Sequence, residues 1–524
     1  MASSSRFNIL KSSIGMSAAT LMSRILGLVR TILEAAVLGG NALASEWGFA
    51  IIFPNIFRRL LGEGALGTAL IPLISNAETE EEKIAIRRKL GVVFTVLGLV
   101  LILIVILVSL FAFFFGHLFK EEYVRNAFKL IPYLMPYAFF ICLIGIGGAC
   151  LSTKRVFFLP ALAGLLLNIF IISTLGYFYY IKTPEIQSVL YRLTGAVLAS
   201  GVIQLIFIGY LMHRNGIFPE FHFLHFAEHK DILRELWNLA LPGLLAGSAL
   251  QLSLLIDKSL AVFISASALP SLSYSERIVY LPVGVFALSV GSVLMADMSR
   301  SAAAGRFDEM LDSLQFSLRH VIFCCLPMSL FVVFFRTEII EALFLRGNFT
   351  MHDMNETSWA MLFYCMGIPF FCSVKVITPA FFARKDMKTP MKISMAAIAV
   401  NIVLNLILMW KMKQGGLALA TVFSSVINNV LLIIFLHRSN FKLNWGELGI
   451  TFFKSAASSA IAGIISFFTI PLLIKLNSLY GGKFLSIIVL LAFFGIIYLI
   501  TNLLLRTAEL HEFLSLLKRR GKKN

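Results

Sequence analysis

The feature that most constrains this chain is a set of long apolar runs with almost no charge. Residues 93–115 form one such run, and residues 484–505 form another that contains no charged side chain. About 18 apolar residues in a helix are enough to cross the ~30 Å hydrocarbon core of a bilayer. Backbone polar groups in lipid must be paired within the protein, so a span is either a helix or part of a closed barrel. The short alternating segments of a barrel do not occur, and the runs therefore predict membrane helices.

The composition agrees with this class and explains the charge. Hydrophobic residues make up 58% of the 524 residues, charged residues only 14%, and the formal net charge is +17. In a soluble protein that charge would suggest nucleic-acid binding. In a chain this apolar, basic loops and a basic tail at the membrane surface explain it better, so we expect no nucleic-acid partner.

The hydropathy pattern predicts an all-α polytopic membrane protein with about fourteen transmembrane helices. The expected spans are residues 13–39, 47–76, 89–117, 126–152, 157–181, 189–212, 237–265, 271–299, 319–345, 357–383, 390–411, 415–437, 449–475 and 483–506. Lys and Arg gather in alternate loops and in the C-terminal tail, so the positive-inside rule places those loops and both termini in the cytoplasm. The first span lacks a cleavable signal pattern and is expected to be a transmembrane helix.

An internal repeat predicts two halves with the same topology. Residues 67–75 resemble 291–299, and residues 154–160 resemble 384–390, at nearly equal separations along the chain. We therefore expect two pseudo-symmetric six-helix lobes over 1–220 and 221–440, followed by two further helices over 441–506 and a basic amphipathic tail over 507–524. Transporters built from parallel repeats bind their cargo between the lobes and rock between two open states.

Charged residues inside the expected spans are the strongest functional signal, because each costs from ~3 kcal/mol upward at mid-bilayer. Most lie in the first two spans of each half: Arg24, Arg30 and Glu34; Glu46, Arg58, Arg59 and Glu63; Asp257 and Lys258; Glu276 and Arg277; Lys375 lies in the tenth span. Matching helices of the two lobes can converge on one cationic cavity, where planar guanidinium groups suit a diphosphate.

Some of these residues have a simpler interpretation. Glu46, Arg59 and Glu276 lie near the ends of spans, where their side chains can reach the membrane surface. Asp257 and Lys258 could form a structural ion pair.

A cationic cavity also argues against a cationic drug as the cargo.

One pair of asparagines admits two interpretations. Asn401 and Asn405 are four residues apart on one helical face, where they could coordinate a monovalent cation or form interhelical hydrogen bonds. The six cysteines lie in apolar stretches without metal-ligand spacing and are expected to be small buried hydrophobes.

The C-terminal tail contains Leu510 among other leucines and then a basic cluster. This pattern predicts an interfacial helix on anionic phospholipids.

The chain lacks the motifs of an energy-converting enzyme. No P-loop, HExxH or GxSxG motif occurs, and no loop is long enough to hold an ATPase. We therefore expect a transporter that is not an enzyme and carries no cofactor. Transport would be coupled to Na⁺, to H⁺, to the membrane potential or to the substrate gradient.

Four stretches resemble the motifs of the MurJ (MviN) lipid II flippase family. They are SRILGLVR at 23–30, PNIFRRLLGEGA at 54–65, the acidic-Arg…PxG segment at 276–284, and VKVITPAFFARKDMKTP at 374–390. The resemblance follows the chain in order over nearly its whole length. It implies the fold of the multidrug/oligosaccharidyl-lipid/polysaccharide (MOP) exporter superfamily.

The resemblance also implies a function and a set of site residues. The family moves lipid II, a peptidoglycan precursor, between leaflets of the bacterial inner membrane in cell-wall biogenesis, and the final two helices hold the lipid tail. The family's cavity arginines carry over to Arg24, Arg30, Arg58 and Arg277, which would bind the diphosphate, and its cavity acid carries over to Glu46. By their charge within the expected spans, Glu63 and Glu276 are further candidates for cavity acids and gating, and Lys258 and Lys375 for additional cavity charge. A sodium site in some members points to Asp257, Asn401 and Asn405.

The resemblance is incomplete at two positions. Thr31 stands where an acidic residue is common in the family, and Tyr280 stands where relatives can have Glu, so the coupling ion is left open. The expected partners are lipid II, membrane phospholipids and cell-wall synthesis or division proteins, and the chain is expected to be a monomer. The alternative cargo is another polyprenyl-linked oligosaccharide.

Overall fold

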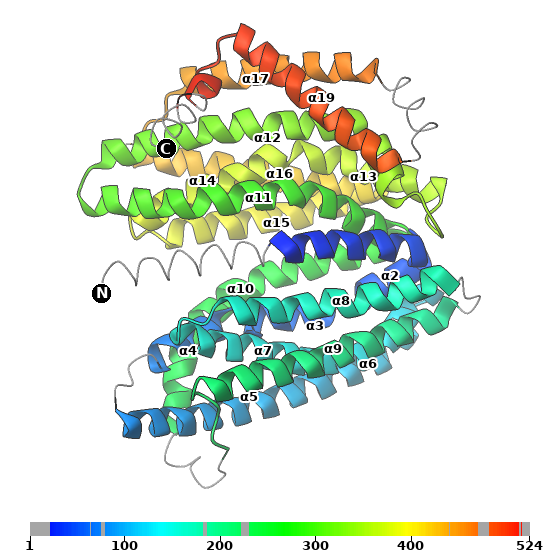
Figure 1. The fold of residues 1–524 in the computed structure, drawn as a ribbon, viewed down its shortest axis with the longest axis vertical. Coiled ribbons are helices and arrows are strands. Elements are labelled where there is room, and N and C mark those ends of the chain that lie inside the picture. Colours follow the sequence, from blue (N-terminus) through cyan, green and yellow to red (C-terminus); the bar gives the residue numbers. More distant parts are fainter. Residues whose placement is uncertain are drawn as a thin grey trace. The chain divides into compact units, whose positions relative to one another are not determined.

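The computed structural model describes residues 21–62, 64–74, 79–181, 186–221, 230–439, 441–469, 482–512 and 515. Across these residues the regular structure is helical, with no strand (Figure 1). Eleven helices in this part are long and apolar enough to cross a membrane. The all-α membrane class is therefore confirmed, whereas the count of fourteen is not. The expected spans 13–39, 47–76 and 271–299, which carry most of the charged residues, are not among the eleven.

The chain divides into two compact units, and the first holds the residues up to Pro270 together with Arg346–Phe349. It contains a helix over residues 21–38, α2 (Ala42–Ala50), α3 (Ile52–Phe57), the π-helix η1 (Arg58–Gly62), α4 (Ala65–Ile74), α5 (Glu80–Phe115), η2 (Gly116–Leu118), α6 (Glu122–Leu134), α7 (Pro136–Thr153), α8 (Phe158–Ile181), α9 (Ile186–Arg214) and α10 (Lys230–Ile264). Here α7 packs against α9, and α10 packs against α4. The division by compactness therefore places α10 in the first unit. The expected boundary between residues 220 and 221 concerns the sequence repeat and stays a prediction.

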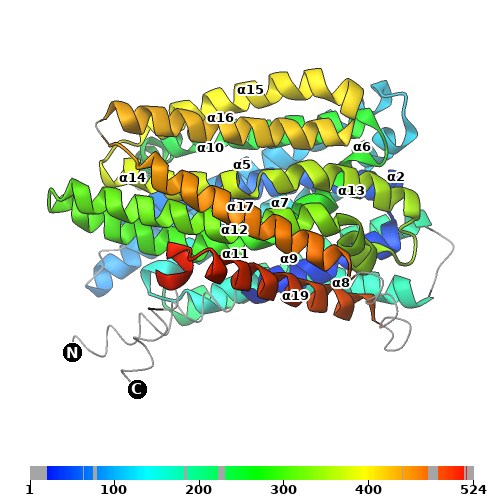
Figure 2. The same cartoon turned by 90° about the horizontal axis from the view of Figure 1, so that it is seen from above.

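The second unit holds Ser271–Leu345 and the chain from Thr350 onward. Its helices are α11 (Ala268–Ala303), α12 (Phe307–Phe344), α13 (Met351–Met366), α14 (Ile368–Ala383), α15 (Lys388–Met412), α16 (Gln414–Arg438), α17 (Trp445–Phe467) and α19 (Lys483–Leu504). α12 packs against α13, α14, α17 and α19, while α15 and α16 lie side by side (Figure 2). Phe335, Phe344 and Phe381 are fully buried in this unit.

Prolines and glycines divide spans that the hydropathy pattern predicts as single helices. The expected span 126–152 is two helices, α6 and α7, which part at Met135 because Pro136 has no N–H to continue the ladder. The expected span 47–76 divides into α2, α3, η1 and α4. At η1 the backbones come very close, since a Cβ on Gly145 of α7 would lie 2.5 Å from the Gly62 carbonyl oxygen. π-Helical turns of this kind are frequent at functional sites.

The turns after α7 and α14 have the same geometry. Arg155 and Lys385 occupy the left-handed region with φ of 59° and 62°. In both turns the next N–H donates to the carbonyl five positions earlier, at 3.1 Å and 3.0 Å. This is the Schellman arrangement of a helix end. The two turns are therefore alike at the positions where the sequence repeat predicts equivalence.

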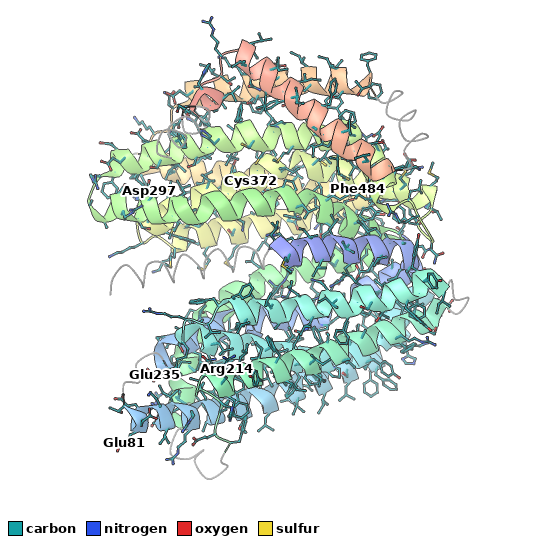
Figure 3. All side chains as sticks on the ribbon, in the orientation of Figure 1. Glu81, Arg214, Glu235, Asp297, Cys372 and Phe484 are labelled. Atoms are coloured by element: carbon teal, nitrogen blue, oxygen red, sulfur yellow. The ribbon has the colours of Figure 1, made fainter. Side chains whose placement is uncertain are left out.

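The cysteines behave as the sequence predicts. All six are free thiols, and all except the half-buried Cys324 are buried. Cys372, labelled in Figure 3, belongs to α14 of the second unit and is fully enclosed. The same figure labels Glu81, Arg214 and Glu235, which gather at one end of the first unit, where charged residues can meet water.

Candidate functional site

The helix over residues 21–38 and α2 hold a small charged network. Arg30 Nε lies 2.9 Å from Glu34 Oε1, one helical turn away, and Trp47 Nε1 donates to the same oxygen at 3.3 Å. Both charged side chains are largely buried. Glu34 therefore orients Arg30 and leaves its terminal N–H groups available to a ligand.

Arg24 and Arg58 are the other predicted arginines of the first unit. Both are half-buried. The Arg24 side chain forms no hydrogen bond or ion pair among the residues that the structure describes. Arg58 opens the π-turn and donates from Nε to Asn55 Oδ1 at 3.3 Å. Glu63 lies outside the described residues.

Glu46 is a buried acid on α2. Its side chain belongs to a residue only 7% exposed, and Asn126 Nδ2 of α6 donates to Glu46 Oε1 at 3.3 Å. Asn126 could not be singled out from the sequence, because it is a neutral residue at the start of an expected span and its contact with Glu46 joins two helices 80 residues apart. Asp257 and Lys258, on α10 of the same unit, are half-buried.

The second unit positions Glu276 and Arg277 on α11. Tyr364 of α13 donates its hydroxyl to Glu276 Oε1 at 2.9 Å, and Ser275 donates to the Thr357 carbonyl at 2.9 Å. Glu276 is thus held by a neighbouring helix. Arg277 is half-buried and Lys375 is exposed. Since Arg277 belongs to a different unit from Arg24, Arg30 and Arg58, their convergence stays a prediction.

The two positions that depart from the family pattern have local partners. Thr31 is buried and donates its hydroxyl to the Gly27 carbonyl at 2.9 Å. Tyr280 stacks on Phe371, with ring centroids 5.5 Å apart. Each therefore fills its place by packing or backbone hydrogen bonding rather than by charge.

Asn401 and Asn405 lie together within the second unit. Asn405 Nδ2 donates to Asn401 Oδ1 at 3.1 Å, and Asn401 Nδ2 reaches Thr421 Oγ1 on α16 at 3.5 Å. Ser424 of α16 donates to the Ala397 carbonyl at 2.6 Å. The Asn401–Thr421 and Ser424–Ala397 bonds join α15 to α16, as the interhelical alternative expects, whereas the Asn405–Asn401 bond lies within α15. Asp257 belongs to the other unit, and a sodium site stays a prediction.

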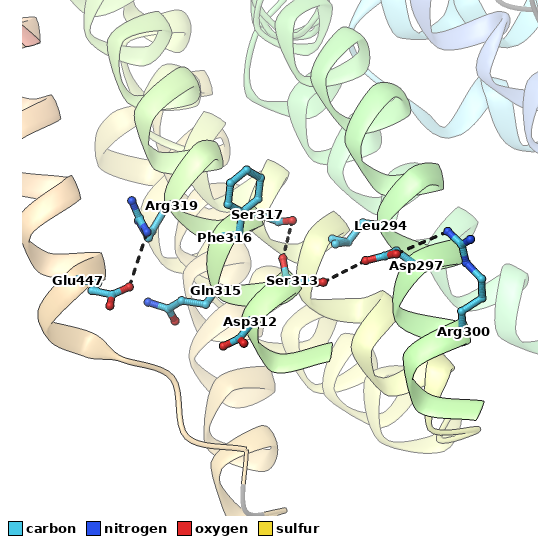
Figure 4. A pocket seen from close by; sticks show the side chains of 10 residues that line it. All are labelled: Leu294, Asp297, Arg300, Asp312, Ser313, Gln315, Phe316, Ser317, Arg319 and Glu447. Carbon is cyan, nitrogen blue, oxygen red and sulfur yellow. Dashed lines mark hydrogen bonds and ion pairs between the residues drawn. The ribbon is translucent and has the colours of Figure 1, made fainter. Parts of the chain in front are cut away.

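A pocket of about 730 Å³ opens in the second unit between the ends of α11, α12 and α17 (Figure 4). Ser313 donates to Asp297 Oδ2 at 3.0 Å, and Arg300 lies 3.5 Å from Asp297. The remaining lining residues are Leu294, Asp312, Gln315, Phe316, Ser317, Arg319 and Glu447. This pocket could not be predicted from the sequence, because its charged residues lie at helix ends, where charge is ordinary.

Arg319, at the edge of this pocket, binds the segment that follows α19. It contacts Glu509 at 2.7 Å, Glu512 at 3.3 Å and Glu447 at 3.7 Å. Thr451 also donates to Glu509 Oε1, at 2.6 Å. Leu510 is buried beside Glu509, so the part of the expected interfacial tail that the structure describes packs on protein. The rest of the tail lies outside the described residues.

Two carboxylates outside the spans have lowered pKa values. The backbone N–H of Thr389 donates to Asp386 Oδ1 at 3.0 Å and lowers the pKa of Asp386, which explains its place in the R.D.KTP motif as a cap on α15. Burial alone would raise the pKa of Glu509. Hydrogen bonds from Thr451 and from Arg319, with the Arg319 charge, outweigh burial and hold that pKa below its usual value.

The sequence matches the family described as lipid II flippase MurJ over residues 34–491. This chain belongs to the MurJ family. A relative from Rhizobium tropici, named "Probable lipid II flippase MurJ", is 30% identical over 467 residues, covering 87% of this chain and 86% of the relative. A relative of the same name from Vibrio cholerae is 29% identical over 445 residues, covering 82% of this chain and 83% of the relative.

Solved structures agree with membership of the MurJ family. A lipid II flippase MurJ in an inward closed conformation has a TM-score of 0.75 and 27% identity, covering 94% of this chain and 99% of that one. An inward-facing MATE family transporter of the MOP superfamily has a TM-score of 0.66 at 16% identity, covering 82% of this chain and 98% of that one. The latter shares the fold alone. The MurJ resemblance and the MOP fold are confirmed.

Proposed function

We propose that this chain is a lipid II flippase, which moves the undecaprenyl-diphosphate-linked peptidoglycan precursor from the cytoplasmic to the periplasmic leaflet by alternating access. The observation that carries the proposal is membership of the MurJ family over residues 34–491, together with structural likeness to a MurJ flippase over 94% of the chain. The arginines of the helix over 21–38, η1 and α11 are the side chains suited to an anionic head group.

Arg24, Arg30, Arg58 and Arg277 would bind the diphosphate. Guanidinium groups form paired hydrogen bonds with phosphate oxygens, and a half-buried setting strengthens them. Arg24 is available for this role because its side chain forms no ion pair within the described chain. Arg30 would bind while it keeps its bond to Glu34, which fixes the direction of the guanidinium plane.

The polyprenyl tail would stay in lipid beside α17 and α19. These helices pack on each other and on α12. Their outer faces are apolar, with Phe453, Phe468 and Leu504 among the most exposed side chains. Removing an isoprenoid chain from water into such apolar surroundings is favourable by about 0.8 kcal/mol per CH₂ group. The tail therefore needs no polar path across the membrane.

The test is complementation of a strain depleted of its own flippase. Arg24→Ala and Arg277→Ala should each abolish growth while protein levels stay normal. Arg306→Ala is the matched control, because its ion pair with Glu309 is exposed on both sides, and growth should continue. Full growth with Arg24→Ala or Arg277→Ala would refute the assigned roles.

Translocation assays in vesicles test the identity of the cargo and the source of coupling independently of each other. Translocation of lipid II, and not of other polyprenyl-linked oligosaccharides, is the expected result, and the reverse would favour the alternative cargo. Removing Na⁺, the proton gradient or the membrane potential one at a time identifies the coupling. Reporter fusions at both ends test the expected inner-membrane topology with cytoplasmic termini, and light scattering tests the expected monomer.

A further inference from the structure

The interface between α17 and α19 in the second unit contains buried polar side chains (Figure 1). Ser455 of α17 is 0% exposed, and Tyr498 and Asn502 of α19 are 5% and 0% exposed. Within the described residues, neither Ser455 Oγ nor Asn502 Oδ1 has a hydrogen-bond partner of regular geometry. Polar atoms buried inside a membrane protein are costly unless they are paired, and nearly all such atoms have a partner. These two atoms therefore indicate a ligand.

The Ser455 side chain differs from its neighbour on the same helix. Ser459 donates its hydroxyl to the Ser455 carbonyl at 2.6 Å, which is the usual way for a buried hydroxyl to satisfy itself within a helix. Ser455 Oγ makes no such bond among the described residues. It lies instead within hydrogen-bonding reach of the Tyr498 hydroxyl, as does the Asn502 side chain. Three polar side chains from two helices thus converge on one point.

This group of side chains is short of hydrogen-bond donors. Tyr498 uses its only proton to donate to the Phe323 carbonyl of α12 at 2.7 Å. Asn502 Nδ2 donates to the Tyr498 carbonyl at 2.8 Å, and Asn502 Oδ1 can only accept. The Ser455 hydroxyl can donate one bond and accept others. A water molecule complements this set, because it donates two hydrogen bonds and accepts from a further group.

A monovalent cation would also suit a group of oxygen atoms, but the nearby charges disfavour it. The carboxylate near Tyr498 is that of Glu509, which accepts from Thr451 one turn before Ser455. Its charge is already matched by Arg319, whose Nε lies 2.7 Å from Glu509 Oε1. A buried cation without an unmatched anion pays a large desolvation penalty, whereas ordering a neutral water molecule costs little. Water is therefore the favoured ligand.

We propose that a buried water molecule binds between Ser455, Tyr498 and Asn502 and joins α17 to α19. The water would pair the polar atoms of two helices that lie beyond the predicted repeat. It would also fix the register in which Thr451 of α17 meets Glu509, after the end of α19. The inference does not depend on the proposed function, because it concerns contacts within the second unit alone.

The first test uses the sign of a stability change. Asn502→Leu keeps the size of the side chain and removes its polar atoms. If water is bound, the change leaves the water and Ser455 without a partner, so the melting temperature in detergent should fall by about 3 °C or more. An equal or higher melting temperature would show that Asn502 Oδ1 has no ligand and would overturn the proposal. Thr501→Val is the matched control, because its hydroxyl bonds the Ile497 carbonyl within α19, and its melting temperature should change by less than about 1 °C.

The second test is direct and does not depend on how the variants fold. An experimental structure of the parent at a resolution that shows ordered water should contain a peak within about 3.2 Å of Ser455 Oγ, Tyr498 Oη and Asn502 Oδ1. Side chains that bond one another there without such a peak would overturn the proposal. Melting in NaCl and in choline chloride at equal ionic strength distinguishes the ligands. A rise specific to Na⁺ that Ser455→Ala abolishes would assign the site to a cation and overturn the water.

Discussion

Arg319 Nε lies 2.7 Å from Glu509 Oε1, a contact that ties α12 to the segment after α19 across 190 residues of sequence. The Arg319 side chain is 14% exposed and that of Glu509 is 3% exposed. Two further carboxylates, on Glu447 and Glu512, surround the same guanidinium group. One arginine therefore fixes α17 and the beginning of the C-terminal tail on α12.

Removing this arginine should destabilise the second unit. Arg319→Met leaves the buried Glu509 carboxylate with its Thr451 hydrogen bond but without a positive charge beside it, and breaking a buried ion pair from one side costs about 3 kcal/mol or more. Denaturant titration in detergent, with proteolysis of the C-terminal segment as the readout, measures the loss in the free energy of unfolding. Arg306→Met is the control, because its exposed pair with Glu309 should contribute about 0.5 kcal/mol or less. Equal losses in the two variants would contradict the assigned role.

The same contact predicts how stability depends on pH. The pKa of Glu509 is lowered in the folded protein, so its contribution is fully present above the ordinary glutamate pKa. It is lost as the pH falls from there through the lowered value, because the carboxyl takes up a proton and releases Arg319. Melting temperatures measured down this acid range should fall more steeply for the parent than for Glu509→Gln. Parallel curves would show that the ion pair does not control acid stability.

Close approach of η1 and α7 predicts a sharp difference between two glycines. Gly145→Ala places a Cβ 2.5 Å from the Gly62 oxygen, so the π-turn that carries Arg58 must shift, at a cost of about 2 kcal/mol. Gly164→Ala on α8 meets nothing within 4 Å and should stabilise by up to about 1 kcal/mol through helix propensity. Thermal unfolding measures both changes. Lipid II translocation should fall only for Gly145→Ala, and normal transport there would separate the π-turn from function.

The turn between α15 and α16 contains a strained residue. Lys413 has φ of 50° and ψ of −131°, a conformation that a side chain disfavours and glycine adopts readily. Lys413→Gly should therefore raise the free energy of unfolding by about 1 kcal/mol. Lys413→Ala keeps the strain and should give no gain. A gain with alanine as large as with glycine would mean that the lysine charge, and not the backbone, is the cause.

The membrane class and the family follow from local sequence patterns. The uncharged run at 484–505 corresponds to α19, and the expected span 157–181 corresponds to α8, because apolar length alone decides whether a segment crosses lipid. The matched turns at Arg155 and Lys385 agree with the repeat, since a helix end is a local structure. Where a proline or glycine interrupts a span, as Pro136 does after Met135, the hydropathy pattern overestimates the length of the helix. The pattern counts apolar residues and not backbone hydrogen bonds.

The contacts of the charged residues could not be predicted in this way. The sequence marks Arg30 and Glu46 as unusual because charge in lipid is costly, but their partners differ in kind. Glu34 lies one turn away, within reach of helical spacing, whereas Asn126 comes from α6. The approach of Glu509 to Arg319 and of Ser455 to Tyr498 depends on how whole helices pack, and no local pattern encodes it.

By itself, therefore, the sequence determined that this chain is a helical membrane protein of a flippase family. Hydrophobic length and motif spacing are properties of contiguous segments and do not depend on how those segments pack. Only the tertiary structure decided which charges are paired, where a π-turn forms, and which polar side chains meet between α17 and α19. Those features arise from packing between distant segments, where a shift of about one ångström makes or breaks a hydrogen bond.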